Sequence, residues 1–282
     1  MNLSDINEVE KLLKRHGFAF SKALGQNFLI DDEVCPAMAE AAIPDDSYCA
    51  IEIGPGIGVL TVELAKRAKK VVSIELDDRL FPILDETLAD YDNIEVLHED
   101  AMKVDMKALI ADKFDGAPVA ICANLPYYIT SPIITGLLEA ELPVESITVM
   151  VQAEAAERLC AHMGTREAGA VTAAIDYYSE ASELFDVPRT SFVPAPKVDS
   201  KVIQLVLRPE PIEKLDNTKA FFNMIKAAFT QRRKTILNSL SATTGKSKDE
   251  LRAIFEENGL SPTARIEQLS MDDLITIYKA TK

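Results

Sequence analysis

The chain alternates short apolar runs with amphipathic segments over most of its length. Apolar runs of strand length occur at residues 50–53, 71–75, 94–97, 119–123 and 147–151. Between them, apolar residues recur at helical spacing, as in residues 59–65 and 77–88. Buried strands that alternate with helices predict right-handed β-α-β units and a parallel sheet that is covered on both faces.

The pattern changes near residue 180, where this regular alternation ends. Short strands are predicted at residues 184–187 and 201–207 on either side of a Pro-rich segment. We expect these two strands to pair antiparallel at one end of the sheet. The two prolines within residues 208–211 exclude a central strand and indicate a stiff linker. Helices are predicted at residues 5–16, 217–241, 247–258 and 270–280.

Composition restricts the class of protein. The chain has 282 residues, of which 48% are hydrophobic, so a large core is expected and global disorder is not. It contains no run of about 18 apolar residues. Its first residues lack the pattern of a signal peptide, so we expect a cytoplasmic protein without a membrane span. The four cysteines and three histidines are scattered, which argues against a disulfide framework and against a bound metal.

Basic residues are concentrated in two islands of an otherwise acidic chain. The net charge is −15, which by itself argues against a nucleic-acid partner. Residues 11–27 nevertheless contain four basic residues, among them Lys22, and no acidic residue. Residues 214–252 contain nine basic residues against three acidic ones. Such islands bind phosphate locally or form solvated helix faces, and charge alone leaves both interpretations open.

Groups suited to an adenosine-containing cofactor follow three successive predicted strands. Gly54, Gly56 and Gly58 form a turn before a helix, where glycine permits positive φ and the close approach of a ligand. Glu75 ends the second strand, where an acid accepts hydrogen bonds from ribose hydroxyls, and Asp100 follows the third, where it can meet an adenine amine. Taken singly, the glycines also fit a structural turn. Glu75 also fits an acidic residue in the first turn of the following helix, and Asp100 also fits a helix N-cap. Together at one sheet edge, with no phosphate-binding Lys after the glycines, they fit S-adenosylmethionine.

The segment Asn124-Leu125-Pro126-Tyr127 follows the fourth strand and provides groups for a second planar ligand. The Asn124 amide oxygen and the Leu125 carbonyl would accept hydrogen bonds from an adenine N6 amine and direct its lone pair at a sulfonium methyl. Tyr127 would stack on the base. A polar turn with a buried tyrosine is the alternative. The segment therefore predicts methyl transfer to an amino nitrogen without a strong general base.

These motifs, with others, resemble those of the KsgA-type small-subunit (16S) rRNA adenine N6-dimethyltransferases, relatives of the macrolide-resistance methyltransferases. The matching segments run almost from end to end of the chain: 24–29 (LGQNFL), 52–58, 74–77 (IELD), 100–102 (DAM), 124–127 (NLPY), 192–200 (FVPAPKVDS) and 231–235 (QRRKT). The glycine turn is shared with many methyltransferases, whereas the combination of QNFL, NLPY and FxPxP is highly specific.

The resemblance implies an S-adenosylmethionine-dependent rRNA (adenine-N6,N6)-dimethyltransferase, an RNA-binding transferase active in rRNA processing, rRNA methylation and ribosome biogenesis. Its fold class would be α/β. Residues 1–208 would form a Rossmann-like methyltransferase domain with a mostly parallel seven-stranded sheet and an antiparallel edge, and residues 209–282 a small helical rRNA-binding domain. The substrate would be two adjacent adenosines in the 3′-terminal hairpin loop of 16S rRNA within 30S particles. We expect a monomer without a metal.

Carried over position by position, the resemblance assigns roles to individual residues. Contacts to S-adenosylmethionine would come from Asn27, Leu29, Gly54, Gly56, Glu75, Asp100 and Asn124. Catalysis on the target adenine would use Asn124, Leu125, Tyr127 and Phe192. Phe192 would pack on the second face of the base. The alternative is that the Phe192 ring only fills the seam between the two domains. The rRNA phosphates would be bound by Lys22, Arg232, Arg233 and Lys234.

The chain departs from the family pattern at a few positions, and other functions share parts of the sequence. Tyr128, Ala153 and Ala168 replace Asn, Lys and Tyr, respectively, beside the core motifs. A large-subunit rRNA methyltransferase of the resistance type would share the active site, but Gly25, residues 198–200 and residues 232–235 favour the small subunit. DNA adenine methyltransferases usually carry Pro instead of Leu after the Asn. A non-catalytic assembly or transcription factor would have lost the glycine turn or Asn124.

Overall fold

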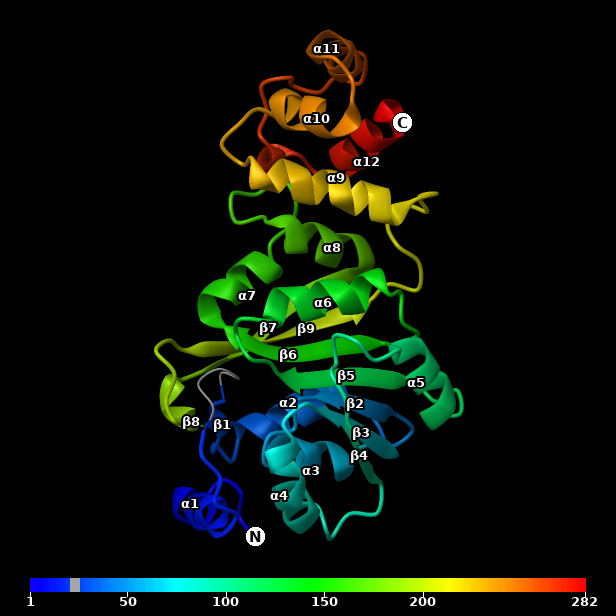
Figure 1. Ribbon diagram of the computed structural model, residues 1–282. Helices are drawn as coiled ribbons and strands as arrows, with labels where there is room; N and C mark the ends of the chain where they lie inside the picture. The colour runs from blue at the N-terminus through cyan, green and yellow to red at the C-terminus, as the bar shows by residue number, and fades with distance from the viewer. Residues whose placement is uncertain (21–25) are drawn as a thin grey trace. The chain divides into compact units, whose positions relative to one another are not determined.

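The computed structural model describes residues 1–20 and 26–282, and a seven-stranded sheet forms its centre (Figure 1). The strands are β2 (Cys49–Ile53), β3 (Lys70–Glu75), β4 (Ile94–His98), β5 (Val119–Asn124), β6 (Ser146–Gln152), β7 (Ser179–Val187) and β9 (Ser200–Leu207). They are ordered β4-β3-β2-β5-β6-β9-β7. Strands β2 to β6 run parallel and β9 runs antiparallel to β6. The predicted mostly parallel sheet with an antiparallel edge is confirmed.

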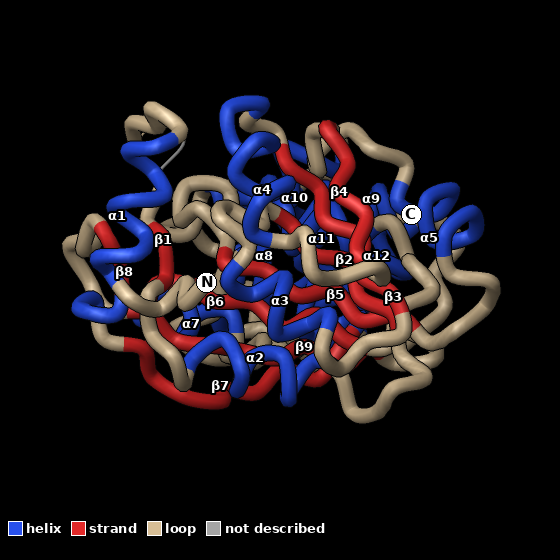
Figure 2. Tube along the Cα trace, turned by 90° about the horizontal axis from the view of Figure 1, so that it is seen from below, coloured by secondary structure: helices blue, strands red, loops and turns tan. Residues whose placement is uncertain are grey.

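Continuous burial explains why the central strands read as uninterrupted apolar runs. Every residue of β2 is buried, as is every residue of β5 except the terminal Asn124. Helices α2 (Val34–Ala42) and α3 (Val59–Ala65) pack against each other and against these strands (Figure 2). Met38 of α2 and Leu64 of α3 are fully buried in one hydrophobic cluster with residues of the strands. The central strands, from which the loops of the pocket leave, are therefore held by close packing of their side chains.

Several shorter elements surround this sheet. They are α1 (Ile6–Arg15), η2 (Asp78–Leu80), α4 (Phe81–Thr87), α5 (Met106–Lys113), α6 (Thr130–Glu139), α7 (Ala153–Leu159) and η3 (Arg189–Ser191). The helix predicted at residues 77–88 begins as the 3-10 turn η2 and continues as α4. Pro82 occupies the start of α4, where its missing N–H costs no helical hydrogen bond. A separate two-stranded antiparallel sheet joins β1 (Phe28–Leu29) to β8 (Phe192–Val193), with Leu29 opposite Phe192.

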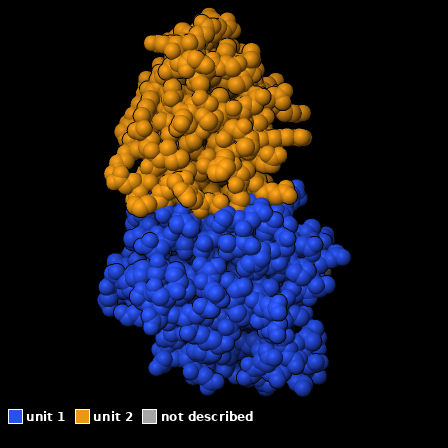
Figure 3. Space-filling model, turned by 180° about the vertical axis from the view of Figure 1, so that it is seen from behind, with its two compact units in different colours: residues 1–156, 182–207 blue, residues 157–181, 208–282 orange. Residues whose placement is uncertain are grey.

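The chain divides into two compact units, coloured separately in Figure 3. The first contains Met1–Ala156 and Ser182–Leu207, and the second contains Glu157–Ala181 and Arg208–Lys282. The break after Leu207 lies next to the stiff linker predicted at residues 208–211. Residues 157–181 are grouped with the C-terminal helices, although the sequence-based boundary at residue 208 assigns them to the first domain. Whether either predicted domain folds independently stays a prediction.

The second unit is helical and has an aromatic core. Its helices are α8 (Ala170–Tyr178), α9 (Thr218–Thr230), α10 (Ile236–Thr244), α11 (Lys248–Glu257), η4 (Ile266–Gln268) and α12 (Met271–Thr281). Rings from α8, α9 and α12 pack with centroid distances between 4.8 and 5.7 Å. These rings belong to Tyr177, Tyr178, Phe221, Phe222 and Tyr278. Residues 157–181 join this unit because α8 supplies two of the rings.

The single helix predicted at residues 217–241 is wrong. It is two helices, α9 and α10, separated by a turn at residues 231–235. The buried positions stop at Ala228 and resume at Ile236, so no apolar stripe supports a helix between them. The Ile236 amide donates to the carbonyl of Ala264, 2.7 Å away, instead of to the carbonyl of Arg232 as a continuous helix would require. The residues Arg232, Arg233 and Lys234 consequently lie on a turn and not on a helix face.

Candidate functional site

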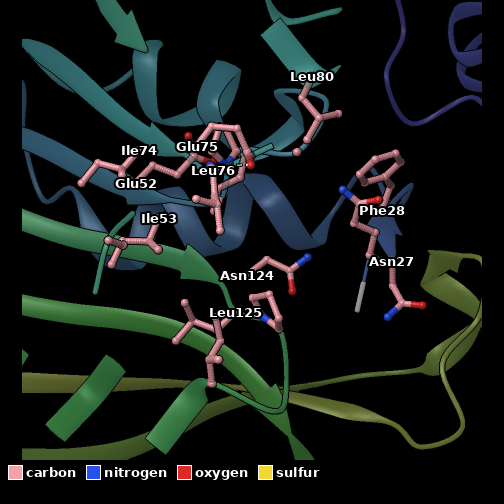
Figure 4. Close-up of a pocket in the computed structure, with 18 of the residues that line it drawn as sticks. Asn27, Phe28, Glu52, Ile53, Ile74, Glu75, Leu76, Leu80, Asn124 and Leu125 are labelled. Atoms are coloured by element: carbon pink, nitrogen blue, oxygen red, sulfur yellow. Dashed lines mark hydrogen bonds between the residues drawn. The ribbon is translucent and has the colours of Figure 1, made fainter. Parts of the chain in front are cut away.

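The parallel strands leave a pocket at their carboxyl ends. The chain passes from β2 to β3 and β4 on one side and returns to β5 and β6 on the other, so the strand order reverses beside β2. Open α/β sheets bind ligands at such a point. A cavity of about 170 Å³ lies there, lined by the ends of β2, β3 and β5 and by residues 26–29. Figure 4 shows Glu75, Asn124 and Asn27 around this space.

Two glycines of the turn after β2 are required for different reasons. Gly56 has a φ of 60°, and an added Cβ would lie 3.3 Å from the Phe28 ring. Gly58 has a φ of 91°, and an added Cβ would lie 2.9 Å from Leu88 Cδ2. Side chains are strained at both φ values. Gly58 therefore allows α4 to approach, whereas Gly54 and Gly56 line the pocket.

Glu75 is the buried acid at the end of β3. One of its carboxylate oxygens accepts from the Leu76 amide at 2.8 Å and from the Asp77 amide at 2.7 Å. Burial raises the pKa of Glu75, and the hydrogen bonds from the Asp77, Leu76 and Gly56 amides oppose that rise. Its side chain is held by these backbone amides and lines the pocket. Its predicted contact to ribose hydroxyls stays a prediction.

Asp100 lines the same pocket but is partly occupied by local contacts. Its Oδ1 accepts from the Met102 amide at 3.0 Å, and its Oδ2 lies 3.0 Å from Lys103 Nζ. The Lys103 contact, followed by the Met102 amide, lowers the pKa of Asp100. Asp100 therefore caps a turn at residues 101–103, and no helix begins at Ala101 as the alternative interpretation of this residue expected. Its predicted contact to an adenine amine stays a prediction.

Asn124 ends β5 with its side chain in the pocket. Within residues 1–20 and 26–282, neither its amide group nor the Leu125 carbonyl oxygen has a hydrogen-bond partner. Leu125 is 1% exposed, and Pro126 after it has no N–H to offer. Buried polar groups normally find a partner. Asn124 is only partly buried, so these two acceptors are accessible to a ligand with donor hydrogens in the pocket.

The Tyr127 ring is held in place by a group for which the sequence alone gave no role. Its hydroxyl lies 2.7 Å from Ser200 Oγ, and Ser200 is fully buried at the start of β9. Burial raises the pKa of Tyr127, so its phenol remains protonated near neutral pH. Phe192, 3% exposed, also lines the pocket. Asn124, Leu125, Tyr127 and Phe192 are thus brought together, although their predicted roles stay predictions.

Residues 26–29 are tied to the end of β3. Gln26 Nε2 donates to Asp77 Oδ2 at 2.8 Å, and the other partner of Asp77 is Arg79, whose Nη2 lies 2.6 Å from the same oxygen. Arg79 Nη1 also donates to the Ala19 carbonyl at 3.3 Å. Asn27 and Leu29 line the pocket next to this network. Sequence spacing gave no indication of the Gln26–Asp77 contact, because it joins residues 51 positions apart.

Glu52 is a fully buried acid on the floor of the pocket. It is 1% exposed and accepts from Thr61 Oγ1 at 2.6 Å and Ser73 Oγ at 2.7 Å. Burial raises the pKa of Glu52 from 4.5 to about 7, and the two hydroxyl hydrogen bonds only partly oppose this. Glu52 therefore holds a proton in the folded protein at a pH at which the unfolded chain has released it.

Replacing Glu52 with Gln should remove one pH-dependent contribution to stability. The folded state binds the extra proton between pH 4.5 and about 7. The contribution of Glu52 to the free energy of unfolding consequently falls as pH rises through that window, by about 3 kcal/mol. Urea unfolding across this range should show a smaller decline for Glu52→Gln than for wild type. Asp85→Asn, at an exposed position, controls for the loss of one negative charge. Identical pH profiles for wild type and Glu52→Gln would refute the raised pKa of Glu52.

Three of the four predicted RNA-binding residues, Arg232, Arg233 and Lys234, are absent from the pocket lining. Lys22 lies outside the described residues. Arg232, Arg233 and Lys234 are in the second unit, on the turn between α9 and α10. Arg232 donates from Nη2 to the Arg166 carbonyl and its Nε lies 3.8 Å from Glu267 Oε2. Arg233 and Lys234 are exposed, and neither forms an ion pair with a residue that the structure describes.

Two features of the described residues bear on other kinds of site. No group of three or more His, Cys, Asp or Glu side chains in residues 1–20 and 26–282 is arranged to hold a metal ion. Across the same residues, no helix has the length and apolar character needed to cross a membrane.

Comparison with known proteins gives consistent results. A family model described as "Ribosomal RNA adenine dimethylase" matches residues 17–282. The chain is 46% identical over 278 residues to "Ribosomal RNA small subunit methyltransferase A" of Bacillus mycoides and of Bacillus anthracis, covering 97% of this chain and 95% of each relative. A dimethyladenosine transferase from Plasmodium falciparum has a similar structure (TM-score 0.72, 26% identity, 89% of this chain and 96% of that one). So does the 23S rRNA methyltransferase ErmE (TM-score 0.66, 29% identity, 90% and 98%).

Proposed function

The chain belongs to the ribosomal RNA adenine dimethylase family, and on that premise we propose that it dimethylates N6 of two adjacent adenosines in 16S rRNA. The target is the 3′-terminal hairpin loop, and the methyl donor is S-adenosylmethionine. The enzyme acts on 30S particles during subunit biogenesis in the cytoplasm, as a monomer without a metal. One observation carries the proposal: the unpaired acceptors of Asn124 and Leu125 share a pocket with the glycine turn and Glu75.

The residues of the pocket fit S-adenosylmethionine. Gly54 and Gly56 keep the turn free of side chains, and Glu75 is a fixed acceptor for ribose hydroxyls. Asp100 retains acceptor capacity for an adenine amine beside its local contacts. Asn27 and Leu29, from the N-terminal segment of the chain, also line the pocket. The cofactor supplies an electrophilic methyl group on a sulfonium sulfur, whose positive charge suits a site with several acidic side chains.

The chain's own contribution to the reaction is binding and orientation. In the first of the two transfers, the Asn124 amide oxygen and the Leu125 carbonyl accept the two N6 hydrogens of the adenine, which weakens conjugation of the amine with the ring and directs its lone pair at the methyl group. In the second transfer, one of these acceptors binds the single remaining hydrogen. Tyr127, fixed by Ser200, stacks on the base. Phe192 packs on the other face. After transfer, the extra proton leaves to solvent, since no strong general base is required.

The relatives support a small-subunit substrate over a large-subunit one. Identity is 46% to proteins named for the small subunit and 29% to the 23S rRNA methyltransferase ErmE. Labelled methyl groups should therefore be incorporated into unmethylated 30S particles and not into 50S particles. Incorporation into 50S particles alone would assign the chain to the alternative substrate. No incorporation, with particle binding retained, would favour a non-catalytic assembly factor.

Replacing Glu75 with Ala should weaken cofactor binding. The loss of hydrogen bonds to the ribose should cost about 1–3 kcal/mol, which corresponds to roughly a 5- to 150-fold rise in Kd. Calorimetry with S-adenosylhomocysteine measures this. Glu75→Gln, which keeps one acceptor oxygen, should fall between wild type and Glu75→Ala. Asp85→Ala controls for the loss of one exposed negative charge, and unchanged affinity in Glu75→Ala would remove Glu75 from the site.

A further inference from the structure

One short sheet joins the cofactor side of the pocket to the side of the target base. Strand β1 pairs with β8 so that Leu29, predicted to contact the cofactor, lies opposite Phe192, predicted to pack on the target adenine. Figure 1 shows these two strands side by side. Both residues are buried in the same hydrophobic cluster, and both line the pocket. A displacement of either strand therefore changes the distance between the two ligands.

A side-chain hydrogen bond reinforces the pairing of β1 with β8, since two strands of two residues are marginal by themselves. Ser191 Oγ donates to Asp31 Oδ2 at 2.6 Å, and the Ile30 amide donates to the Ser191 carbonyl at 2.9 Å. The hydrogen bond from Ser191, followed by those from the amides of residues 33 and 34, lowers the pKa of Asp31 against the opposing effect of its burial. The bond from Ser191 is therefore charge-assisted, and such bonds are roughly twice as strong as neutral ones.

The loop that carries Phe192 also leads to the residue that holds Tyr127. This loop is closed at its base, because the Arg189 amide donates to Asp199 Oδ1 at 2.9 Å. The next residue along the chain is Ser200, whose Oγ lies 2.7 Å from the Tyr127 hydroxyl. One series of contacts consequently runs from the cofactor segment, through the loop, to both aromatic residues that are predicted to hold the target base.

We propose that Asp31 and Ser191 are positioning residues, which align the cofactor with the target adenine and make the binding of the two ligands cooperative. Neither residue is among the described residues that line the pocket, so the pair acts through β1 and β8 and not by touching a ligand. The inference rests on the proposed function, since it takes S-adenosylmethionine and an adenine as the two ligands. A cofactor that holds β1 in place also holds β8, and a bound base has the reciprocal effect.

Cooperative binding is tested with Ser191→Ala, which removes the bond to Asp31 and leaves the Glu33 amide bonded to the same carboxylate at 3.0 Å. Wild type saturated with unmethylated 30S particles should bind S-adenosylhomocysteine roughly 5- to 150-fold more tightly than the free protein does, the range typical of coupled sites. In Ser191→Ala this ratio should fall to about 2-fold or less, while the affinity of the free protein changes by no more than about 2-fold. Equilibrium dialysis with labelled S-adenosylhomocysteine measures both quantities.

Alignment is tested by the single-turnover rate at saturating cofactor and 30S particles. Ser191→Ala should be about 10- to 100-fold slower than wild type, because a displacement of about 1 Å between reacting atoms has an effect of this size. Asp31→Asn keeps an acceptor oxygen but loses the charge, so its rate and its binding ratio should be intermediate. It also provides the same comparison if Ser191→Ala does not fold. Asp32→Asn, at the adjacent and exposed position, is the matched control and should behave like wild type.

A double variant shows whether the two residues act through their common bond. Asp31→Ala/Ser191→Ala should be no slower than Asp31→Ala, because both substitutions remove the same hydrogen bond. Rate losses that multiply in the double variant would mean that the residues act independently, and would overturn the proposal.

A role in stability alone gives a different result. It would lower the midpoint of thermal unfolding of Ser191→Ala but leave the binding ratio and the single-turnover rate of the folded protein as in wild type. That result would overturn the proposal, as would a wild-type protein whose affinity for S-adenosylhomocysteine is the same with and without 30S particles. In both cases methylation of 30S particles by wild type would leave the proposed function intact. If wild type methylates no rRNA, the proposed function fails and this inference fails with it.

Discussion

Asn124→Ala is expected to lower the rate of methyl transfer by about 10²–10³-fold, the loss typical of removing one electrostatic contact to a transition state. The reason is that the Asn124 amide oxygen orients the N6 amine and stabilises its developing positive charge. Binding to 30S particles should change by no more than about 2-fold, since the residue acts on the reacting group only. Single-turnover kinetics and particle binding, measured on the same preparation, separate the two effects.

Asn124 is a favourable position for this test because its side chain has no hydrogen-bond partner within the described residues. Its removal should therefore leave the thermal unfolding midpoint unchanged, unlike that of Glu75 or Glu52, whose carboxylates are bonded within the protein. Asn124→Asp keeps an acceptor oxygen and should retain part of the activity. Wild-type single-turnover rates in Asn124→Ala would show that the proposed mechanism is wrong.

Tyr127→Ala is expected to reduce both substrate binding and turnover. Stacking of a base on an aromatic ring contributes about 1–3 kcal/mol, so kcat/KM should fall roughly 5- to 150-fold. The ring holds the adenine outside its RNA context, which costs unstacking energy. Kinetics with 30S particles measure the effect on KM and kcat separately.

Two milder variants distinguish the ring from its hydroxyl. Tyr127→Phe keeps the stacking surface and loses the hydrogen bond to Ser200. Ser200→Ala loses the same bond from the other side. The activities of Tyr127→Phe and Ser200→Ala should be similar, and both should be much higher than that of Tyr127→Ala. Equal activities of Tyr127→Phe and Tyr127→Ala would exclude stacking as the function of this residue.

The sheet and the pocket were accessible from sequence because they depend on local patterns. A strand buried on both faces, such as β5, is a continuous apolar run. Groups that follow parallel strands, such as Glu75 and Asn124, meet at one sheet edge whatever the details of packing. The pocket lining therefore includes every described residue that was predicted to contact cofactor or target base.

Other features depend on contacts between distant residues, which no local pattern contains. The turn at residues 231–235 interrupts a helical sequence because its polar residues offer no face to bury. Strands β1 and β8 have two residues each, too short for any periodicity, and pair only through the fold. The bond from Arg232 to Arg166 joins positions 66 residues apart. Adjacent cations that look equivalent in sequence consequently have different surroundings in the structure.

The most direct test of the account is the identity of the methylated nucleoside. Unmethylated 30S particles would be incubated with the protein and labelled S-adenosylmethionine, and the 16S rRNA would then be digested and its modified positions mapped. The account predicts N6,N6-dimethyladenosine at two adjacent positions of the 3′-terminal hairpin loop. Label on a different atom, on a nucleotide elsewhere in the rRNA, or on no nucleotide would contradict it.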